Sequence, residues 1–386
     1  MSDVTLKKKD EYFLSIAKQG THSFMMLGVV VNDAPKLLAR VGKRGEIDPG
    51  ASSTFTIIKK AILTRILSRL ADEGVFRRSG HVSSINYQAY EINYEQVKEF
   101  LGMIYEIEEK QNQNPVIRDA IKRKYGDEGI EQEAIECFVP IEESGDVVTF
   151  RLKKLNEYEF LATEELKVKI NSEIISGVQE ININNTCRTS SKNIVESILG
   201  FVTDVSNYFF IALKHESKLI AGQPEKESFY ILPPPPNCEN ISKKQNSILK
   251  KTYKRLEEMP KLNPNSPETR NKFNALRAMY KNIAGENKLS AKELLEKILE
   301  HEYKNQNSLF EKRSPNFFSR IFSISSSTKR MLDDMESNLK RVMTSQEVNE
   351  VKNKFKIKSD IVINSNEERI QEPTDSISVS PPYIKY

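Results

Sequence analysis

The sequence predicts an α+β protein, with an antiparallel sheet and helices in a first domain and helices alone in a second. Two observations favour the sheet. Aliphatic, strand-like runs at 24–31 and 134–141 are each followed by turn residues and a second apolar run. A third observation separates the domains, because Pro233 to Pro236 interrupt the chain and the pattern from 241 to 301 is helical.

The first predicted element pair is a β-hairpin. Phe24 to Val31 is aliphatic, with Gly28 as its only break. The turn cluster Asn32 to Pro35 follows, and the apolar run Leu37 to Val41 comes after it.

A helix, a strand and a second helix are expected next. Apolar residues at helical spacing predict a helix over 56–70, ended by Asp72-Glu73-Gly74. Residues 84–92 read as a strand. Asn93 then resembles an N-cap, and Gln96 completes a capping-box pattern at the start of the next helix.

The polar stretch 111–129 is expected to be a loop. Residues 134–141 and 146–152 flank a turn and predict a second hairpin. Cys187 then opens an apolar, helix-periodic run that continues to about residue 202.

The proline run is the predicted domain boundary, because four prolines continue neither a strand nor a helix. This divides the chain into a first domain at 1–235, a helical domain at 236–345 and a disordered tail at 346–386. Helices are expected at 271–284, 289–299 and 331–343, the second with Ser290 and Glu293 as a capping pair.

Composition excludes several classes of protein. The 386 residues include 58 Lys and Arg against 54 Asp and Glu, a net charge of +4, which does not indicate a dedicated nucleic-acid binder. The longest apolar stretch, Phe24 to Val31, is too short to span a membrane, and no secretory signal peptide is apparent. Three cysteines do not form a disulfide framework, so a reducing compartment is expected.

Cys187 is the main chemical candidate. Unpaired N–H groups at a helix N-terminus favour a thiolate, which is a nucleophile. The alternative is a cysteine packed under the helix start. Cys137 lies in a strand-like run and is expected to be a buried apolar residue, whereas Cys238 lies in a loop without an obvious partner.

His22 is the candidate general base. It opens the first strand, where the apolar strand behind it could hold the imidazole rigidly at the edge of a cleft. An ordinary strand-end histidine is the alternative. His215, among charged residues, is the competing base.

A third group should orient the histidine. With the hairpin turn centred between Asp33 and Ala34, the partner of His22 falls near Gly45, so Glu46 or Asp48 could reach the imidazole. The oxyanion donors would be the Cys187 N–H and one side-chain amide, from Asn184, Asn185 or Gln88.

Neither a phosphate-binding glycine loop nor a metal-ligand pattern is seen, and no cofactor is expected.

A strand-opening histidine followed far downstream by a cysteine at a helix start resembles circularly permuted papain-like families. Several blocks also resemble the Dot/Icm type IV effector proteins of Legionella. These blocks are His22 to Gly28, Leu38 to Lys43, Tyr87 to Ile92, Thr186 to Ser191 and Thr269 to Leu276. The acidic residues Glu367, Glu368 and Glu372 before Tyr383 to Tyr386 are similar to the C-terminal translocation signals of such effectors.

The resemblance implies a permuted papain-like catalytic domain with Cys187 as nucleophile and His22 as base. It implies an effector secreted into the host cytoplasm that acts on a host protein, most simply as a cysteine peptidase or deubiquitinase. A transglutaminase or acyltransferase on the same fold is one alternative. The other is a non-enzymatic binding or adaptor module that uses the helical domain and the aromatic segment Phe317 to Phe322.

Overall fold

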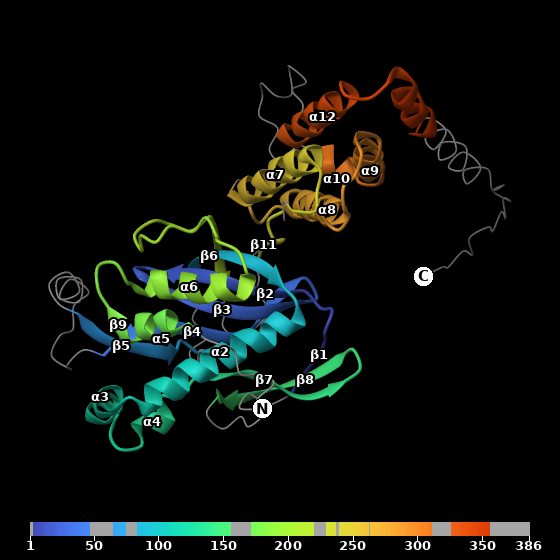
Figure 1. Cartoon of the computed structure of the whole chain (residues 1–386). Helices are drawn as coiled ribbons and strands as arrows, with labels where there is room; N and C mark the ends of the chain where they lie inside the picture. The colour runs from blue at the N-terminus through green and yellow to red at the C-terminus, as the bar shows by residue number, and fades with distance from the viewer. Residues whose placement is uncertain are drawn as a thin grey trace, which may run out of the picture. The chain divides into compact units, whose positions relative to one another are not determined.

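A computed structural model of the chain describes residues 3–46, 65–74, 83–155, 171–219, 229–236, 239–261, 263–310 and 326–355. It is a mixed α+β protein built on antiparallel sheets (Figure 1). The chain divides into two compact units, Met1–Pro235 with Lys254–Phe273, and Pro236–Tyr253 with Asn274–Tyr386.

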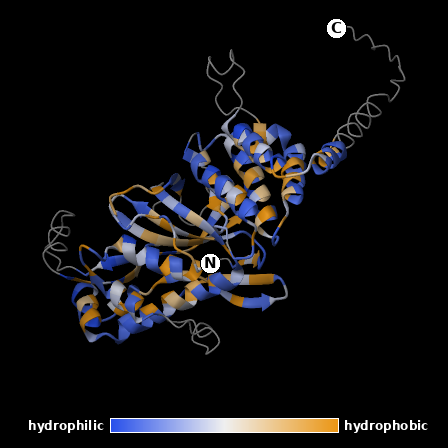
Figure 2. Ribbon diagram, turned by 45° about the horizontal axis from the view of Figure 1, so that its top comes forward, coloured by the Kyte–Doolittle hydropathy of each residue, from blue (hydrophilic) through white to orange (hydrophobic). Residues whose placement is uncertain are grey.

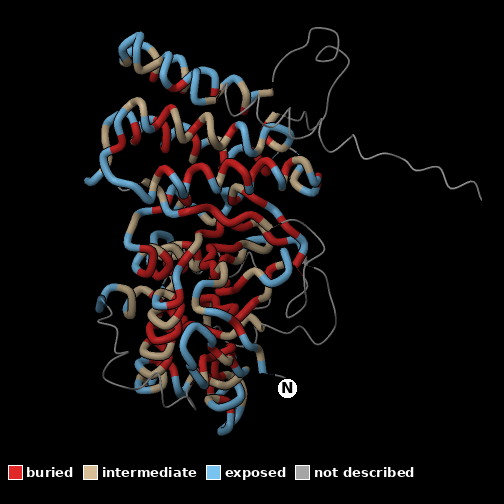
Figure 3. The backbone as a smooth tube through the Cα atoms, turned by 90° about the vertical axis from the view of Figure 1, so that its right-hand side faces the viewer, coloured by how far each residue is buried: buried red, intermediate tan, exposed pale blue. Residues whose placement is uncertain are grey.

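The first unit is organised around an eight-stranded sheet, whose strands are largely buried (Figure 3). The strand order is β10-β6-β2-β3-β4-β5-β9, and β11 pairs with β6 in parallel, whereas the other pairs are antiparallel. The strands are β2 Tyr12–Gln19, β3 His22–Val31, β4 Ala34–Gly45, β5 Ile66–Asp72, β6 Ser83–Ile92, β9 Glu180–Ile181, β10 His215–Leu219 and β11 Ile231–Leu232.

A smaller antiparallel sheet belongs to the same unit. Its strands run in the order β1-β8-β7, with β1 at Val4–Lys7, β8 at Val147–Lys154 and β7 at Glu136–Ser144. The pairing of β7 with β8 confirms the second predicted hairpin.

Four helices of the first unit contact the large sheet: α2 Tyr94–Gln113, α3 Pro115–Tyr125, α5 Ser172–Gln179 and α6 Cys187–Leu199. The short helix α4 Gly129–Gln132 contacts α3. Helix α6 lies against β2, β3 and β4, with α2 and α5 beside it (Figure 1). Ile194, Val195 and Ile198 are buried on α6, so their helical spacing fixes which side of α6 faces the sheet.

The first hairpin forms as predicted, with β3 and β4 joined at Val31 and Ala34. Asn32 and Asp33 have φ values of 52° and 62°, the left-handed conformation that tight hairpin turns require. A register shift between Leu27 and Gly28 then displaces the pairing of residues 24–27 with β4 by one residue.

Two expectations were wrong. The last residues of the predicted helix over 56–70 belong to strand β5, which pairs with both β4 and β9, so sheet formation overrides a local helical pattern. Residues 56–64 lie outside the described chain. The predicted loop over 111–129 is mostly helical, because Asn114 ends α2, caps α3 through its side chain, and Pro115 occupies the first position of α3.

The second unit is helical. Its helices are α9 Ala291–Lys304, α10 Gln306–Phe310 and α12 Ser327–Lys340, while α7 Lys243–Glu258 and α8 Pro267–Ala284 contribute residues to both units. The short 3-10 turn Met259–Lys261 follows α7. Ser290 and Glu293 form the predicted capping box. Figure 2 shows apolar and polar residues alternating around these helices, as their amphipathic sequences require.

Part of the predicted disordered tail is ordered. Residues 345–355 are helical, with Val351 fully buried. Ion pairs of 2.5 Å between Lys354 and Glu296 and 2.6 Å between Lys292 and Glu350 connect this segment to α9. Residues 356–386, the segment Phe317 to Phe322 and Cys238 lie outside the described residues. None of the described helices is long and apolar enough to cross a membrane.

Candidate active site

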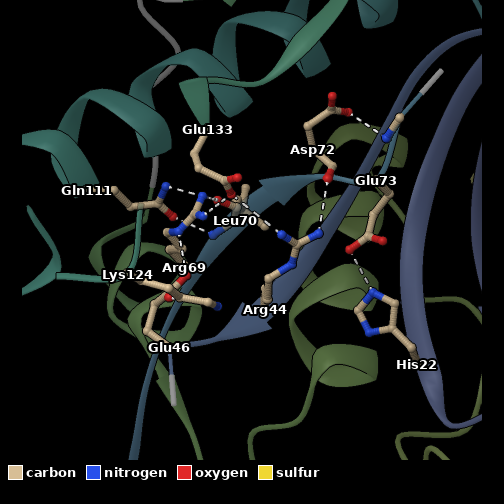
Figure 4. A network of polar contacts seen from close by, with 11 residues as sticks. His22, Arg44, Glu46, Arg69, Leu70, Asp72, Glu73, Gln111, Lys124 and Glu133 are labelled. Atoms are coloured by element: carbon tan, nitrogen blue, oxygen red, sulfur yellow. Dashed lines mark hydrogen bonds and ion pairs between the residues drawn. The ribbon is translucent and has the colours of Figure 1, made fainter. Parts of the chain in front are cut away.

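Three side chains from distant parts of the chain meet where β3 begins, β5 ends and α6 begins. His22 is the first residue of β3, Glu73 directly follows β5, and Cys187 is the first residue of α6. The Nε2 atom of His22 lies 2.9 Å from Oε1 of Glu73 (Figure 4). The imidazole also hydrogen-bonds the Cys187 side chain.

A glycine on the intervening strand permits this contact. The strand order is β3-β4-β5, and Gly42 of β4 pairs with Phe24 of β3. A Cβ atom at Gly42 would lie 2.7 Å from Oε1 of Glu73 and 2.8 Å from Nε2 of His22. Any larger residue would therefore displace the histidine or the carboxylate.

Local sequence places Cys187 at the helix start. Thr186 is the N-cap, and its side chain accepts a hydrogen bond from the Thr189 N–H. Cys187 is partly exposed. The free N–H groups of the first turn add positive potential beside the sulfur.

The Cys187 thiol is held in a state that favours the thiolate. Burial acts to raise its pKa, but the hydrogen bond and charge of His22, the Ser23 N–H and the charge of Lys43 together lower it below the usual value. The Ser23 N–H donates to Cys187 Sγ over 3.3 Å. These contacts match a nucleophile rather than an inert core cysteine.

The pKa of His22 moves in the complementary direction. Burial acts to lower it, but the hydrogen bonds with Cys187 and Glu73 and their negative charges raise it to about 9. Burial likewise opposes ionisation of Glu73, yet His22, Arg44 and Arg40 lower the pKa of its carboxyl. The lowered pKa values of the Cys187 thiol and the Glu73 carboxyl and the raised pKa of His22 together favour a thiolate and a carboxylate beside an imidazolium.

A buried arginine hydrogen-bonds residues that surround the site. Arg188, directly after the cysteine, is fully buried and donates from Nε to Ser23 Oγ over 2.8 Å. Its Nη1 and Nη2 atoms lie 3.4 Å and 3.3 Å from the carbonyl oxygens of Ser206 and Ile211. Arg188 thus connects the residue that donates to the sulfur with the loop after α6.

The predicted third residue was wrong in the case of Glu46. Its carboxylate accepts from Arg69 Nε over 2.6 Å, in a separate cluster with Glu133 and Lys124 (Figure 4). The prediction placed the carboxylate just after β4, whereas β5 pairs with β4 and brings Glu73 to the histidine. Asp48 lies outside the described residues.

Two of the three predicted amide donors are hydrogen-bonded elsewhere. Asn185 donates from Nδ2 to the carbonyls of Gly177 and Glu180 over 2.7 Å and 2.9 Å. Gln88 on β6 donates to Tyr90 and Asp204, and Asn184 is exposed. Among the predicted oxyanion donors, this leaves the Cys187 N–H and the exposed Asn184 amide.

His215 and Cys137 take no part in the site. His215 lies on β10, with β6 and β2 between it and β3, and its ring packs between Tyr87 and Tyr230. Burial lowers its pKa to about 4. Cys137 is fully buried on β7, as expected, and burial raises the pKa of its thiol.

The sequence reasoning missed Glu73, Gly42 and Lys43. Glu73 stood in a turn cluster assigned to a helix end, so its position beside a strand was hidden by the wrong element type. Within the described part of the chain, no group of three or more His, Cys, Asp or Glu side chains is placed to hold a metal ion. The chain matches no family model, no curated protein and no solved structure.

Proposed function

We propose that this protein is a thiol-dependent enzyme that attacks an amide carbonyl of a protein substrate, most simply a cysteine peptidase or isopeptidase. The observation that supports it best is the position of His22 between two partners. Its imidazole contacts both Cys187 and Glu73 and has a raised pKa, while that of the thiol is lowered. A nucleophile, a base and a group that orients the base are the parts of this mechanism.

The reaction would proceed in two stages. The Cys187 thiolate attacks the carbonyl carbon and forms a C–S bond, and the negative charge moves to the carbonyl oxygen. As the C–N bond breaks, the His22 imidazolium transfers its proton to the leaving amine. Water then attacks the thioester and gives a proton to His22, which releases the carboxylic acid and restores the thiolate. An amine in place of water would make the same site a transferase.

The helix start offers stabilisation for the negative oxygen. The Cys187 N–H lies in the first turn of α6, where N–H groups lack intrahelical partners. Such an N–H, aligned with the helix dipole, is a suitable oxyanion donor.

An apolar loop beside the site supports a polypeptide substrate. We name residues 207–212 the aromatic loop; Tyr208 and Phe210 are 64% and 67% exposed, although both are large apolar side chains. Their rings stack at 5.4 Å, so they form one patch. Arg188 and Lys18 bind carbonyls of this loop, which connects it to the residue next to Cys187. Exposed apolar patches are typical of binding surfaces.

The permuted papain-like fold and the effector role remain parts of this proposal. In their favour stand the chain order His22, Glu73, Cys187, the cysteine at a helix start against an antiparallel sheet, and the blocks that resemble Legionella effectors. A host protein would then be the substrate, and a ubiquitin linkage is the first to test.

Covalent labelling tests the proposal. Purified protein is incubated with ubiquitin bearing an electrophilic C-terminus, and separately with a chloromethyl ketone peptide, and adducts are detected by mass spectrometry. The expected adduct maps to Cys187 and disappears in Cys187→Ala and His22→Ala. Absence of any adduct at Cys187 with both probes and with iodoacetamide would instead favour a non-enzymatic binding module.

A further inference from the structure

Lys43 forms an unusual buried cluster behind the nucleophile. It follows Gly42 on β4 and is 2% exposed. Its Nζ atom lies 2.6 Å and 2.5 Å from the carbonyl oxygens of Gly177 and Glu180, and 3.2 Å from that of Asn185. It also lies 3.1 Å from Asn185 Oδ1 and 3.1 Å from Ser190 Oγ. All five atoms belong to residues 177–190, the segment that leads into Cys187 and the first turn of α6.

The surrounding atoms favour a charged lysine. Each of the five is an oxygen that can accept, and an ammonium supplies three hydrogens without a lone pair. A neutral amine would direct its lone pair at these oxygens, of which only the Ser190 hydroxyl could donate to it. A buried ammonium also needs a nearby negative charge, yet no carboxylate of the described residues lies in ion-pair contact with it. The negative groups that act on Lys43 electrostatically are Cys187 and Glu180.

We infer that Lys43 is a positioning residue, whose ammonium fastens the segment 177–190 to β4 and supplies a positive charge that favours the Cys187 thiolate. This inference rests on the proposed role of Cys187 as nucleophile. One residue thereby joins the strand that lies between His22 and Glu73 to the loop that delivers the cysteine.

Burial opposes the charge on Lys43, whereas its neighbours favour it. Burial lowers the pKa of Lys43 to about 7, and the negative charges of Cys187 and Glu180 oppose that decrease. The other groups that act on the thiol are His22 and the Ser23 N–H on β3, while Lys18 on β2 and Arg188 on α6 interact electrostatically with it. Of all the groups that act on the thiol, Lys43 is the one that donates hydrogen bonds to the segment 177–190.

The test compares Lys43→Met with Arg69→Met in the full chain. Arg69 is an equally buried cation on β5, but it pairs with Glu46 and Glu133 away from the sulfur. The rate of Cys187 alkylation by iodoacetamide is measured from pH 5 to 10. Lys43→Met should raise the midpoint of the profile by about one unit and lower the rate at pH 6.5 about tenfold. Arg69→Met should keep the wild-type midpoint despite its loss of stability.

A folded Lys43→Met protein with the wild-type midpoint would overturn the inference. If that variant does not fold, Ser190→Ala decides, because it removes one oxygen and keeps the lysine. A smaller shift in the same direction supports the role of Lys43, and an unchanged midpoint refutes it. Because alkylation reports the thiolate itself, failure to process any protein substrate would refute the proposed function without affecting this result.

Discussion

At the scale of single residues, His22 interacts with two different groups, the Glu73 carboxylate and the Cys187 thiol. Glu73 holds Nε2 at 2.9 Å, and its side chain is only 15% exposed, so water competes weakly for this contact. Cys187 hydrogen-bonds the same imidazole. The carboxylate therefore stabilises the imidazolium that must form beside the thiolate.

Glu73→Gln should lower activity and thiolate reactivity at neutral pH by about 100-fold, because a neutral amide no longer stabilises the imidazolium. Alkylation of Cys187 and turnover of the reactive substrate found by labelling measure this. The matched control is Glu46→Gln, a similarly buried acid in the Arg69 cluster. It should reduce stability and leave the pH profile of Cys187 unchanged. Equal effects of the two substitutions would remove Glu73 from the site.

Gly42→Ala tests the close approach of His22 and Glu73 to Gly42 on β4. The added methyl group would overlap Glu73 and His22, so we expect activity to fall about 100-fold through misplacement of the base. Gly28→Ala on β3 is the comparison, since its methyl group would overlap Phe13 and the Lys36 carbonyl instead. Both should unfold at lower urea concentration. In the folded protein, only Gly42→Ala should change the pH profile of alkylation, and an unaltered profile would show that the overlap is relieved elsewhere.

At the scale of elements, β5 has the largest influence on the site. It lies between β4 and β9, with Val41 opposite Asp72. That register leaves Glu73 as the next residue, and its N–H donates to the Arg40 carbonyl over 2.9 Å. A local helical pattern ahead of β5 concealed this arrangement, because pairing with two strands depends on residues far away in sequence.

The aromatic loop is the element expected to recognise the substrate. Tyr208→Ser together with Phe210→Ser should raise KM for a peptide substrate about tenfold, because binding buries less apolar area. The rate with iodoacetamide should stay at the wild-type value. Val342→Ser, at a 54% exposed apolar position of the second unit, is the control and should change neither quantity. An unchanged KM in the loop variant would place the binding surface elsewhere.

At the scale of the whole molecule, the charged site makes stability depend on pH. The pKa of His22 is raised to about 9 in the folded protein, above its ordinary value of 6.5. Its contribution to stability is therefore fully present below pH 6.5 and is lost as the pH rises through 9. Lys43 has the opposite effect on the pH dependence of stability. Burial lowers its pKa, so its contribution to stability increases as the pH rises.

The His22 contribution is isolated by comparing wild type with His22→Asn. The difference in free energy of unfolding should be largest near pH 6 and should decrease between pH 6.5 and 9. Urea titrations at several pH values provide the measurement. A difference that is constant over this interval would contradict a raised pKa for His22.

Local signals in the sequence were sufficient for many elements and for two residues of the site. The turn Asn32–Asp33, the capping boxes at Asn93 and Ser290, and the start of α6 at Cys187 all depend on residues within a few positions of one another. For that reason a thiol at a helix start and a histidine at a strand start could be recognised from the chain alone.

Long-range packing sets which groups surround the Cys187 thiol and the His22 imidazole. Glu73 reaches His22 because β5 pairs with β4 and because Gly42 leaves room between the strands. Lys43 reaches the segment before Cys187 across more than 130 residues of sequence. These contacts depend on strand order and on the register shift between Leu27 and Gly28, which are properties of long-range packing. Local sequence therefore pointed to the Cys187 thiol and the His22 imidazole, and long-range packing set their charge environment.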